Sequence, residues 1–291
     1  ISGFESLTVT GAVDQDMDFL SNNTIATVTD GVGGANAVAF SDASADVATL
    51  VLSTADNTSS VTVDRKTDTS DDSLSITLRD GDATAVTVND EESLTIDSST
   101  AATTITTLNA ADVTSITITG DEGATIGSIA GNASLATVDA SASTGAVSVG
   151  ATANASQVAM TITAGSGGLT ADGGTVADTM TGGAGVDNFD GNGGNDTLIG
   201  GAGNDDLDGG AGNDTLTGGA GDDAITAGTG NDTITGGAGD DTITVAANYT
   251  SADSIDGGDG ADTLAITTAN GTTTIAANTV SNVEALEMTA A

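Results

Sequence analysis

Several residue types are missing from this sequence. Its 291 residues include no Cys, Pro, His or Trp, and only one Tyr and four Phe. Without Cys the chain has no disulfides, and without His and Cys it lacks the side chains that zinc and copper favour. An HExxH zinc site and a Ser-His-Asp triad are therefore excluded, and no G-x-S-x-G nucleophile elbow occurs.

Large apolar side chains and positive charges are also scarce. Much of the 37% apolar content is Ala, so a compact globule would bury little apolar area. At about 25 cal/mol per Å², that burial would offset little of the conformational entropy lost when the backbone is ordered. The net charge is −39, from 42 acidic residues against Arg65, Lys66 and Arg79. Such a surface repels nucleic acid and anionic lipid, so we expect no nucleic-acid partner.

The ends and apolar runs of the chain give two further expectations. No apolar run approaches the roughly 20 residues that span a membrane, so no transmembrane segment is predicted. The chain opens at Ile1 without Met or a signal-peptide pattern, so we expect a fragment or a processed product.

Nine-residue repeats run without a gap from Gly173 to Thr244. Their sixth positions are all aspartate: Asp178, Asp187, Asp196, Asp205, Asp214, Asp223, Asp232 and Asp241. Their eighth positions are all apolar: Met180, Phe189, Leu198, Leu207, Leu216, Ile225, Ile234 and Ile243. After a three-residue insertion at 245–247, two further units keep the register with Asp253 and Asp262.

The residue types of one unit predict its shape. The first six residues are mostly Gly, which favours a tight turn with carbonyls pointing inward. The last three form a short strand whose central apolar side chain faces in. Two units make a coil of eighteen residues, so alternate units stack about 4.8 Å apart, at strand spacing.

This stacking brings acidic side chains together. Asp187 comes to lie beside Asp205, and Asp205 beside Asp223, and the carboxylates would repel one another without a cation. Ca²⁺ suits such a site because it takes about 6–8 oxygen ligands, whereas Mg²⁺ demands a tighter octahedron. We therefore predict that calcium binds between the coils and that folding depends on it.

Residues 1–172 have a different pattern, in which apolar residues alternate with Thr or Ser. Such alternation predicts β-strands with one buried face. The segments begin at Leu7, Val61, Leu74, Val86, Leu94, Ile116, Val147 and Met160. Their spacing drifts around twenty residues, which leaves a solenoid and a sandwich as alternatives. The whole chain is thus predicted to be all-β.

Three domains follow from these patterns: a β-rich region over 1–172, a parallel β-roll over 173–265 and a β-strand extension over 266–291. The segment Ile1–Thr10 is similar to Val280–Thr289 at an offset of 279 residues. Either a common strand sequence recurs by chance, or the extension begins the next unit of a tandem array.

The nonapeptide resembles the RTX repeat, GGxGxDxUx, a calcium-binding β-roll signature. The resemblance implies that each ion is bound by two consecutive turns on the same side of the roll. The first turn provides its aspartate and the backbone carbonyls of repeat positions two and four. The next turn provides its aspartate and the carbonyls of positions one and three. For five sites the implied carbonyls are Gly183, Gly185, Gly200 and Ala202; Asn192, Gly194, Gly209 and Ala211; Gly201, Gly203, Gly218 and Ala220; Gly210, Gly212, Ala227 and Thr229; and Gly219, Gly221, Gly236 and Ala238. A sixth pair of stacked turns includes the atypical first repeat, which contains Asp178. Six or more ions are therefore expected, and Asp262 is a further candidate ligand.

We expect no enzyme. Acid groups such as Asp90/Glu91/Glu92 and Asp121/Glu122 are better explained as solvated loop acids or extra calcium ligands than as glycosidase carboxylates. Among the eight uninterrupted repeats, Thr occupies the third position only at Thr175 and Thr229, so the turns carry no hydroxyl row of the kind that ice binding needs.

The composition and the repeats together resemble RTX-containing S-layer and surface-array proteins of Gram-negative bacteria. This resemblance implies type I secretion, an extracellular cell-surface location, and calcium-dependent folding outside the cell. The expected partners are other copies of the chain in an oligomer or lattice, with cell-surface polysaccharide as a further candidate. The alternative is an adhesin or stalk module that calcium makes rigid and that presents a ligand-binding domain.

Overall fold

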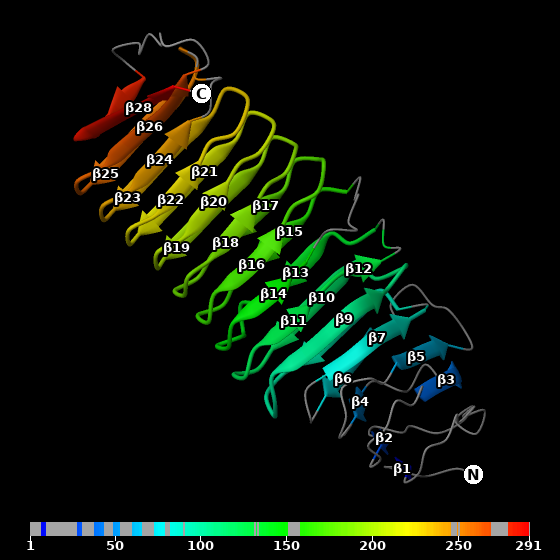
Figure 1. Cartoon of the computed structure of the whole chain (residues 1–291). Helices are drawn as coiled ribbons and strands as arrows, with labels where there is room; N and C mark the ends of the chain where they lie inside the picture. The colour runs from blue at the N-terminus through cyan, green and yellow to red at the C-terminus, as the bar shows by residue number, and fades with distance from the viewer. Residues whose placement is uncertain are drawn as a thin grey trace. The chain divides into compact units, whose positions relative to one another are not determined.

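Every secondary-structure element in the described part of the chain is a β-strand, and all the strand pairs are parallel (Figure 1). The computed structural model describes residues 7–9, 28–30, 38–43, 49–52, 60–65, 73–78, 82–89, 91–130, 132, 134–150, 158–245, 249, 251–268 and 279–290. The chain divides into two units, Ile1–Val158 and Ala159–Ala291.

The first unit is a solenoid. Its strands are β1 (Leu7–Val9), β2 (Val28–Asp30), β3 (Val38–Ala43), β4 (Thr49–Leu52), β5 (Ser60–Arg65), β6 (Ser73–Leu78), β7 (Asp82–Val88), β8 (Ser93–Asp97), β9 (Thr103–Asn109), β10 (Ser115–Thr119), β11 (Ala124–Ile126), β12 (Ile129–Ala130), β13 (Thr137–Asp139) and β14 (Val147–Val149). Apart from β1 paired with β2 and β12 paired with β9, alternate strands stack in two sheets, ordered β13-β10-β8-β6-β4 and β14-β11-β9-β7-β5-β3. The prediction of an all-β chain is confirmed, and between the predicted alternatives the parallel stacking selects the solenoid.

Coil length in the first unit is irregular. Ser93 pairs with Ser73 in one direction and with Ser115 in the other, which are 20 and 22 residues away. Alternation of apolar and hydroxyl residues places Leu94 and Ile96 inside, at 1% and 0% exposure. Branched and apolar side chains suit such a half-buried pleated surface. The irregular coil length explains why the sequence spacing drifts.

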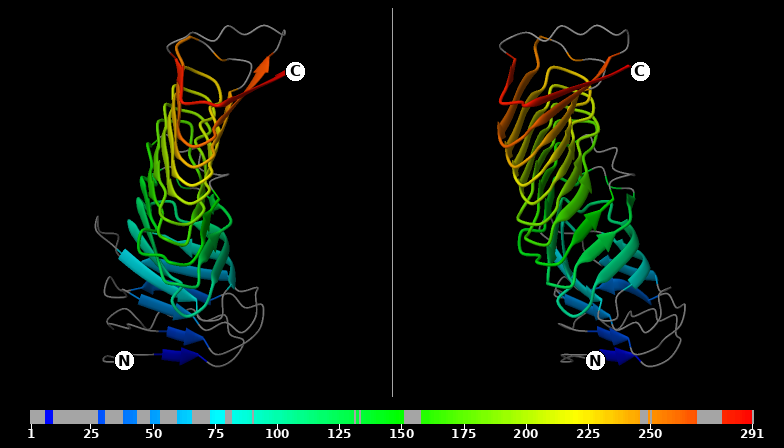
Figure 2. Two further views of the ribbon diagram at one scale, coloured as in Figure 1. Left: turned by 90° about the vertical axis from the view of Figure 1, so that its left-hand side faces the viewer. Right: turned by 60° about the vertical axis from the view of Figure 1, so that its left-hand side comes forward.

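The second unit is regular. Its strands are β15 (Thr161–Thr163), β16 (Leu169–Asp172), β17 (Thr179–Thr181), β18 (Asn188–Asp190), β19 (Thr197–Ala202), β20 (Asp206–Asp208), β21 (Thr215–Ala220), β22 (Ala224–Thr226), β23 (Thr233–Ala238), β24 (Thr242–Val245), β25 (Ser254–Asp259), β26 (Thr263–Thr268), β27 (Val280–Ser281) and β28 (Ala285–Ala290). Odd-numbered strands form one sheet and even-numbered strands the other, each in chain order. Figure 2 shows the coils of this unit as a stack of loops.

The register of the second unit confirms the eighteen-residue coil. Thr179 pairs with Thr197, Thr197 with Thr215 and Thr215 with Thr233, each 18 residues apart. The next step, from Thr233 to Ser254, is 21 residues, as the three-residue insertion predicts. Coils also continue upstream of Gly173, because Ile162 pairs with Met180 in the same register.

The apolar residues at position eight form the core of the roll. All eight, from Met180 to Ile243, are at most 1% exposed, as the strand pattern predicted. The two similar segments, Ile1–Thr10 and Val280–Thr289, can be compared in the structure only in part. Residues 1–6 and 10 lie outside the described residues, whereas β28 covers Ala285–Ala290.

Candidate metal centre

The sixth-position aspartates form two ladders that run along the turns of the roll. Ladder A contains Asp178, Asp196, Asp214, Asp232 and Asp253, and ladder B contains Asp187, Asp205, Asp223, Asp241 and Asp262. In each ladder, Oδ1 of one aspartate accepts the backbone N–H of the aspartate one coil earlier, at 2.7–3.0 Å. Met160 and Leu169 provide the first N–H of each ladder.

The second carboxylate oxygen of most of these aspartates has no partner. Oδ2 is buried and without a hydrogen bond in Asp196, Asp205, Asp214, Asp223, Asp241 and Asp262. These residues are at most 2% exposed. Leaving a buried acceptor unsatisfied costs about 1–3 kcal/mol, and more for a charged group. Six such atoms in two rows form a donor set that a cation can satisfy.

Each of these oxygens lies beside a backbone carbonyl of the following coil, next to the glycine at position one. A methyl group added to Gly191 would lie 2.6 Å from the carbonyl oxygen of Gly209 and 2.7 Å from Oδ2 of Asp196. The same point beside Gly209 lies 2.6 Å from the Ala227 oxygen and 2.8 Å from Asp214 Oδ2. The carbonyl oxygen and the carboxylate oxygen thus both approach one point beside the glycine, which makes the two atoms neighbours that one calcium ion could share as ligands.

The backbone carbonyls that the RTX resemblance predicts as ligands all lie in the stacked turns of the roll. Position-one carbonyls face the aspartate Oδ2 of the preceding coil: Gly200, Gly209, Gly218, Ala227 and Gly236. Position-two carbonyls face the position-two glycine of the next coil: Gly183, Asn192, Gly201, Gly210 and Gly219. Position-four carbonyls likewise face the position-four glycine of the next coil: Gly185, Gly194, Gly203, Gly212 and Gly221.

Some turn carbonyls also take part in hydrogen bonds between coils. The position-three N–H of Ala202 donates to the Gly183 oxygen at 2.9 Å, and the position-three carbonyls of Ala211, Ala220, Thr229 and Ala238 accept the N–H of a position-four glycine at 2.8–2.9 Å. A carbonyl oxygen has two lone pairs. These groups therefore keep the capacity to coordinate a cation.

The first two repeats are built differently from the rest. Oδ2 of Asp178 accepts the N–H of Gly174 at 2.7 Å, and Oδ2 of Asp187 accepts that of Gly183 at 2.9 Å. Positive φ at position two begins only in the third repeat, at Asn192 with 61°. In the first two repeats the backbone thus satisfies the oxygen that is left orphaned further along.

Ladder A changes again at its far end. The repeat of Asp232 carries Ala227 at position one, where the repeats of Asp196 and Asp214 carry Gly191 and Gly209. Asp232 is not among the aspartates with an orphaned Oδ2. The following unit, 248–256, has no glycine. The two ladders are therefore unequal: Asp196 and Asp214 have orphaned oxygens in A, and Asp205, Asp223, Asp241 and Asp262 in B.

Burial controls the acidity of the ladders. It raises the pKa of Asp196, Asp214 and Asp223 to about 6, with repulsion from neighbouring aspartates adding to the effect and backbone hydrogen bonds opposing it. Burial also raises the pKa of Asp187, Asp205, Asp232 and Asp241. Carboxylates that are costly to ionise in a closed site are the groups that a bound cation would stabilise.

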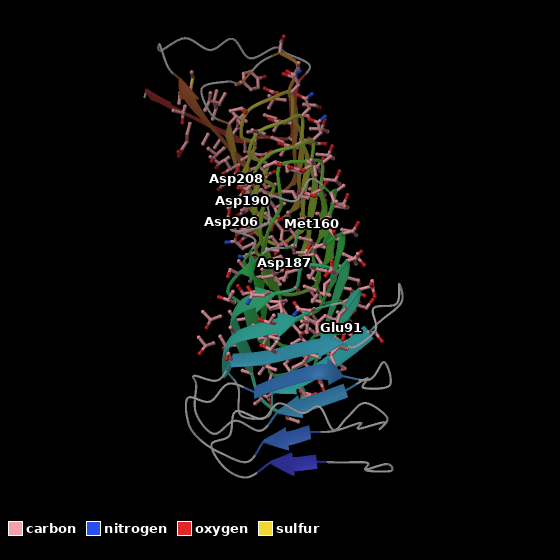
Figure 3. All side chains as sticks on the ribbon, turned by 90° about the vertical axis from the view of Figure 1, so that its right-hand side faces the viewer. Glu91, Met160, Asp187, Asp190, Asp206 and Asp208 are labelled. Atoms are coloured by element: carbon pink, nitrogen blue, oxygen red, sulfur yellow. The ribbon has the colours of Figure 1, made fainter. Side chains whose placement is uncertain are left out.

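Acids outside the ladders have other settings. Asp190 and Asp208 are register partners on the outer face of β18 and β20, beside exposed Asp206 (Figure 3). Asp121 and Glu122 are exposed as expected, but Glu91 is fully buried rather than solvated. Within the described residues no three acidic side chains converge on one point, because each turn supplies one carboxylate and several carbonyls.

The fold and the ladders define a class: a parallel β-solenoid whose coils are joined through buried carboxylates with unsatisfied oxygens. Comparison with family models makes this specific. The RTX calcium-binding nonapeptide repeat matches residues 172–207, 181–216, 199–234, 217–247 and 250–265. Residues 172–265 are therefore an RTX β-roll, and these repeats imply calcium binding and are typical of secreted proteins.

Other comparisons add no relative. Searches of curated proteins and of solved structures found no significant match. In the part of the chain that the structure describes, no helix is long and apolar enough to cross a membrane.

Proposed function

We propose that this chain is a calcium-dependent structural protein of the bacterial cell surface that assembles with copies of itself. The observation that carries the calcium part is the set of six buried, unpartnered Oδ2 atoms, each in a turn of an RTX roll. The ligands would be these oxygens together with the turn carbonyls that face them. When bound, calcium would supply positive charge between coils that otherwise stack carboxylate on carboxylate.

A structural role agrees with the composition. Catalysis that depends on His or Cys is excluded because the chain has neither. A chain with a charge of −39 repels itself in the absence of calcium, which favours an expanded state before secretion and folding outside the cell. RTX repeats are typical of secreted proteins, which supports the location that we propose.

The last coil supports assembly. β28 pairs with β26, and no other described strand pairs with its second edge. Leu286 and Met288 on this strand are each 49% exposed. Open strand edges favour the addition of another strand, and the sequence similarity of Ile1–Thr10 to Val280–Thr289 favours a second copy of this chain as its source.

Hydrogen exchange of the full chain tests the calcium part. With a chelator, we expect the amides of β19–β24 to exchange rapidly, and with millimolar calcium to become protected, because the orphaned carboxylates then have their partner. The strands β8–β11 of the first unit provide an internal reference, since no ladder of buried aspartates runs through the residues that the structure describes there. Protection of β19–β24 in chelator equal to that in calcium would contradict the proposal.

Sedimentation across a calcium titration tests assembly. We expect species larger than the monomer after roll protection is complete. Met288→Asp places a charge at the exposed edge and should reduce this growth without changing the protection of β19–β24. A protein that stays monomeric at saturating calcium and high concentration would instead favour the adhesin or stalk function.

A further inference from the structure

The acid ladder does not stop where the repeats stop. Asp262 is the last aspartate of ladder B, and its N–H donates a 2.8 Å hydrogen bond to Oε2 of Glu284. Every earlier step of this ladder uses an aspartate Oδ1 in that place, for example Asp241 N–H to Asp262 at 2.9 Å. Glu284 therefore occupies the sixth-position place of the next coil, outside the residues that match the RTX repeat.

Backbone hydrogen bonds fix the same register. The carbonyl of Asp262 accepts the N–H of Ala285 at 2.9 Å, as that of Asp241 accepts the N–H of Thr263 at 2.8 Å. Ser281 pairs with Asp256, so Asn282 lies opposite Gly257. The turn then takes two residues from Asn282 to Glu284, whereas it takes five from Gly257 to Asp262. The longer side chain of Glu fits this shorter turn.

The end of the ladder contains the same unsatisfied oxygen as the repeats. Oδ2 of Asp262 has no hydrogen-bond partner, and the residue is 0% exposed. A methyl group added to Gly257 would lie 2.6 Å from this atom and also against the carbonyl oxygen of Asn282. Asn282 is held by its Nδ2, which donates to Oδ1 of Asp256 at 2.7 Å.

We propose that Asp262, Glu284 and the carbonyl of Asn282 form a further calcium site that extends ladder B by one coil beyond the repeats. The proposal rests on calcium binding by the roll. Glu284 is exposed, so water can complete the oxygen shell that calcium requires. The site would fix β28 onto β26 and so hold in place the edge strand that carries Leu286 and Met288.

Calcium counting on the full chain tests this site with a matched pair of variants. Glu284→Gln keeps the shape of the side chain but removes its charge, and Glu287→Gln makes the same change three residues away, at an exposed position on β28. Equilibrium dialysis at saturation should give about one ion fewer for E284Q and no change for E287Q, because only Glu284 reaches the ladder. Hydrogen exchange in calcium should show β28 less protected in E284Q alone.

The outcomes separate this site from the roll. A wild-type chain that binds no calcium contradicts the proposed function as a whole. Equal ion counts and equal β28 protection in wild type and E284Q overturn the terminal site and leave the roll intact. Loss of protection throughout β19–β24 in E284Q also contradicts it, since a site at Glu284 should affect the coil of β27 and β28 and not the distant repeats.

Discussion

The backbone N–H of Asp205 donates a 2.8 Å hydrogen bond to Oδ1 of Asp223, the equivalent residue one coil further along the roll. The N–H of Asp187 makes the same bond to Asp205. One carboxylate oxygen of Asp205 thus joins two coils, while the other is buried without a partner. The atom that joins the coils and the atom proposed as a calcium ligand are therefore different oxygens, and the two roles can be tested separately.

Asp205→Asn should weaken calcium binding while leaving the coil contact in place. The amide oxygen can still accept the N–H of Asp187, but the charge that faces the ion is lost. Outer-shell substitutions at metal sites cost about 10–100-fold in affinity, so loss of a ligand charge should cost at least about tenfold. Calcium titration followed by calorimetry measures this.

The control for Asp205→Asn is Asp206→Asn. It removes the same charge from the next residue, which is exposed on β20. Equal loss of affinity in both variants would show that net charge, not the ladder, determines binding.

Gly191→Ala should interfere with one site. The added methyl group would lie 2.6 Å from the Gly209 oxygen and 2.7 Å from Asp196 Oδ2, in the space between two proposed ligands. We expect the calcium count to fall by about one, or the affinity to fall about tenfold. Gly193→Ala is the matched control from the same repeat, because its methyl group meets only the Ala211 oxygen, at 3.8 Å. A calcium count unchanged in both variants would place the ion elsewhere.

Asp178→Asn should affect stability without changing the calcium count. Both oxygens of Asp178 already accept backbone N–H groups, from Met160 and from Gly174. An amide can replace one of these acceptors but not both, so the variant should lose about 1 kcal/mol of stability. Asp214→Asn, from the same ladder, should instead reduce the number or affinity of bound ions. Parallel losses of calcium in the two variants would mean that the first repeat binds metal as the others do.

Acid should stabilise the metal-free roll. The pKa values of Asp196, Asp214 and Asp223 are raised to about 6 from 3.8, so the folded state binds more protons than the unfolded chain between these values. Its stability in chelator is therefore greatest at low pH and falls as pH rises through about 6. Hydrogen exchange of β19–β24 in chelator should show more protection at about pH 4.5 than at about pH 7.5.

Calcium should show the opposite pH dependence. Protons compete with calcium for the same oxygens, so apparent affinity should decrease as pH falls through about 6. Asp223→Asn removes one titrating group and should flatten both profiles. An affinity that stays constant between about pH 7.5 and about pH 5 would mean that these aspartates are not the ligands.

The sequence alone was enough to predict the roll. A strict nine-residue period places Asp at position six and an apolar residue at position eight, and period determines which side chains face the core whatever the details of the stack. Phe189 and Leu207 are buried as that rule requires. The period also predicted the three-residue insertion, since Ile234 still pairs with Ile255.

Only the tertiary structure decided which carboxylate oxygens are left without a partner. Asp187 and Asp205 hold the same position in the repeat, yet the first accepts the N–H of Gly183 and the second has a free Oδ2. The difference depends on the backbone φ angles in the turn. Glycine can adopt either sign of φ, so the sequence does not fix these angles, and the stacking of the coils determines them. Glu284 follows no period at all. It joins ladder B because β27 and β28 pair with the coil before them, and pairing between strands far apart in the chain is a property of the folded stack rather than of local sequence.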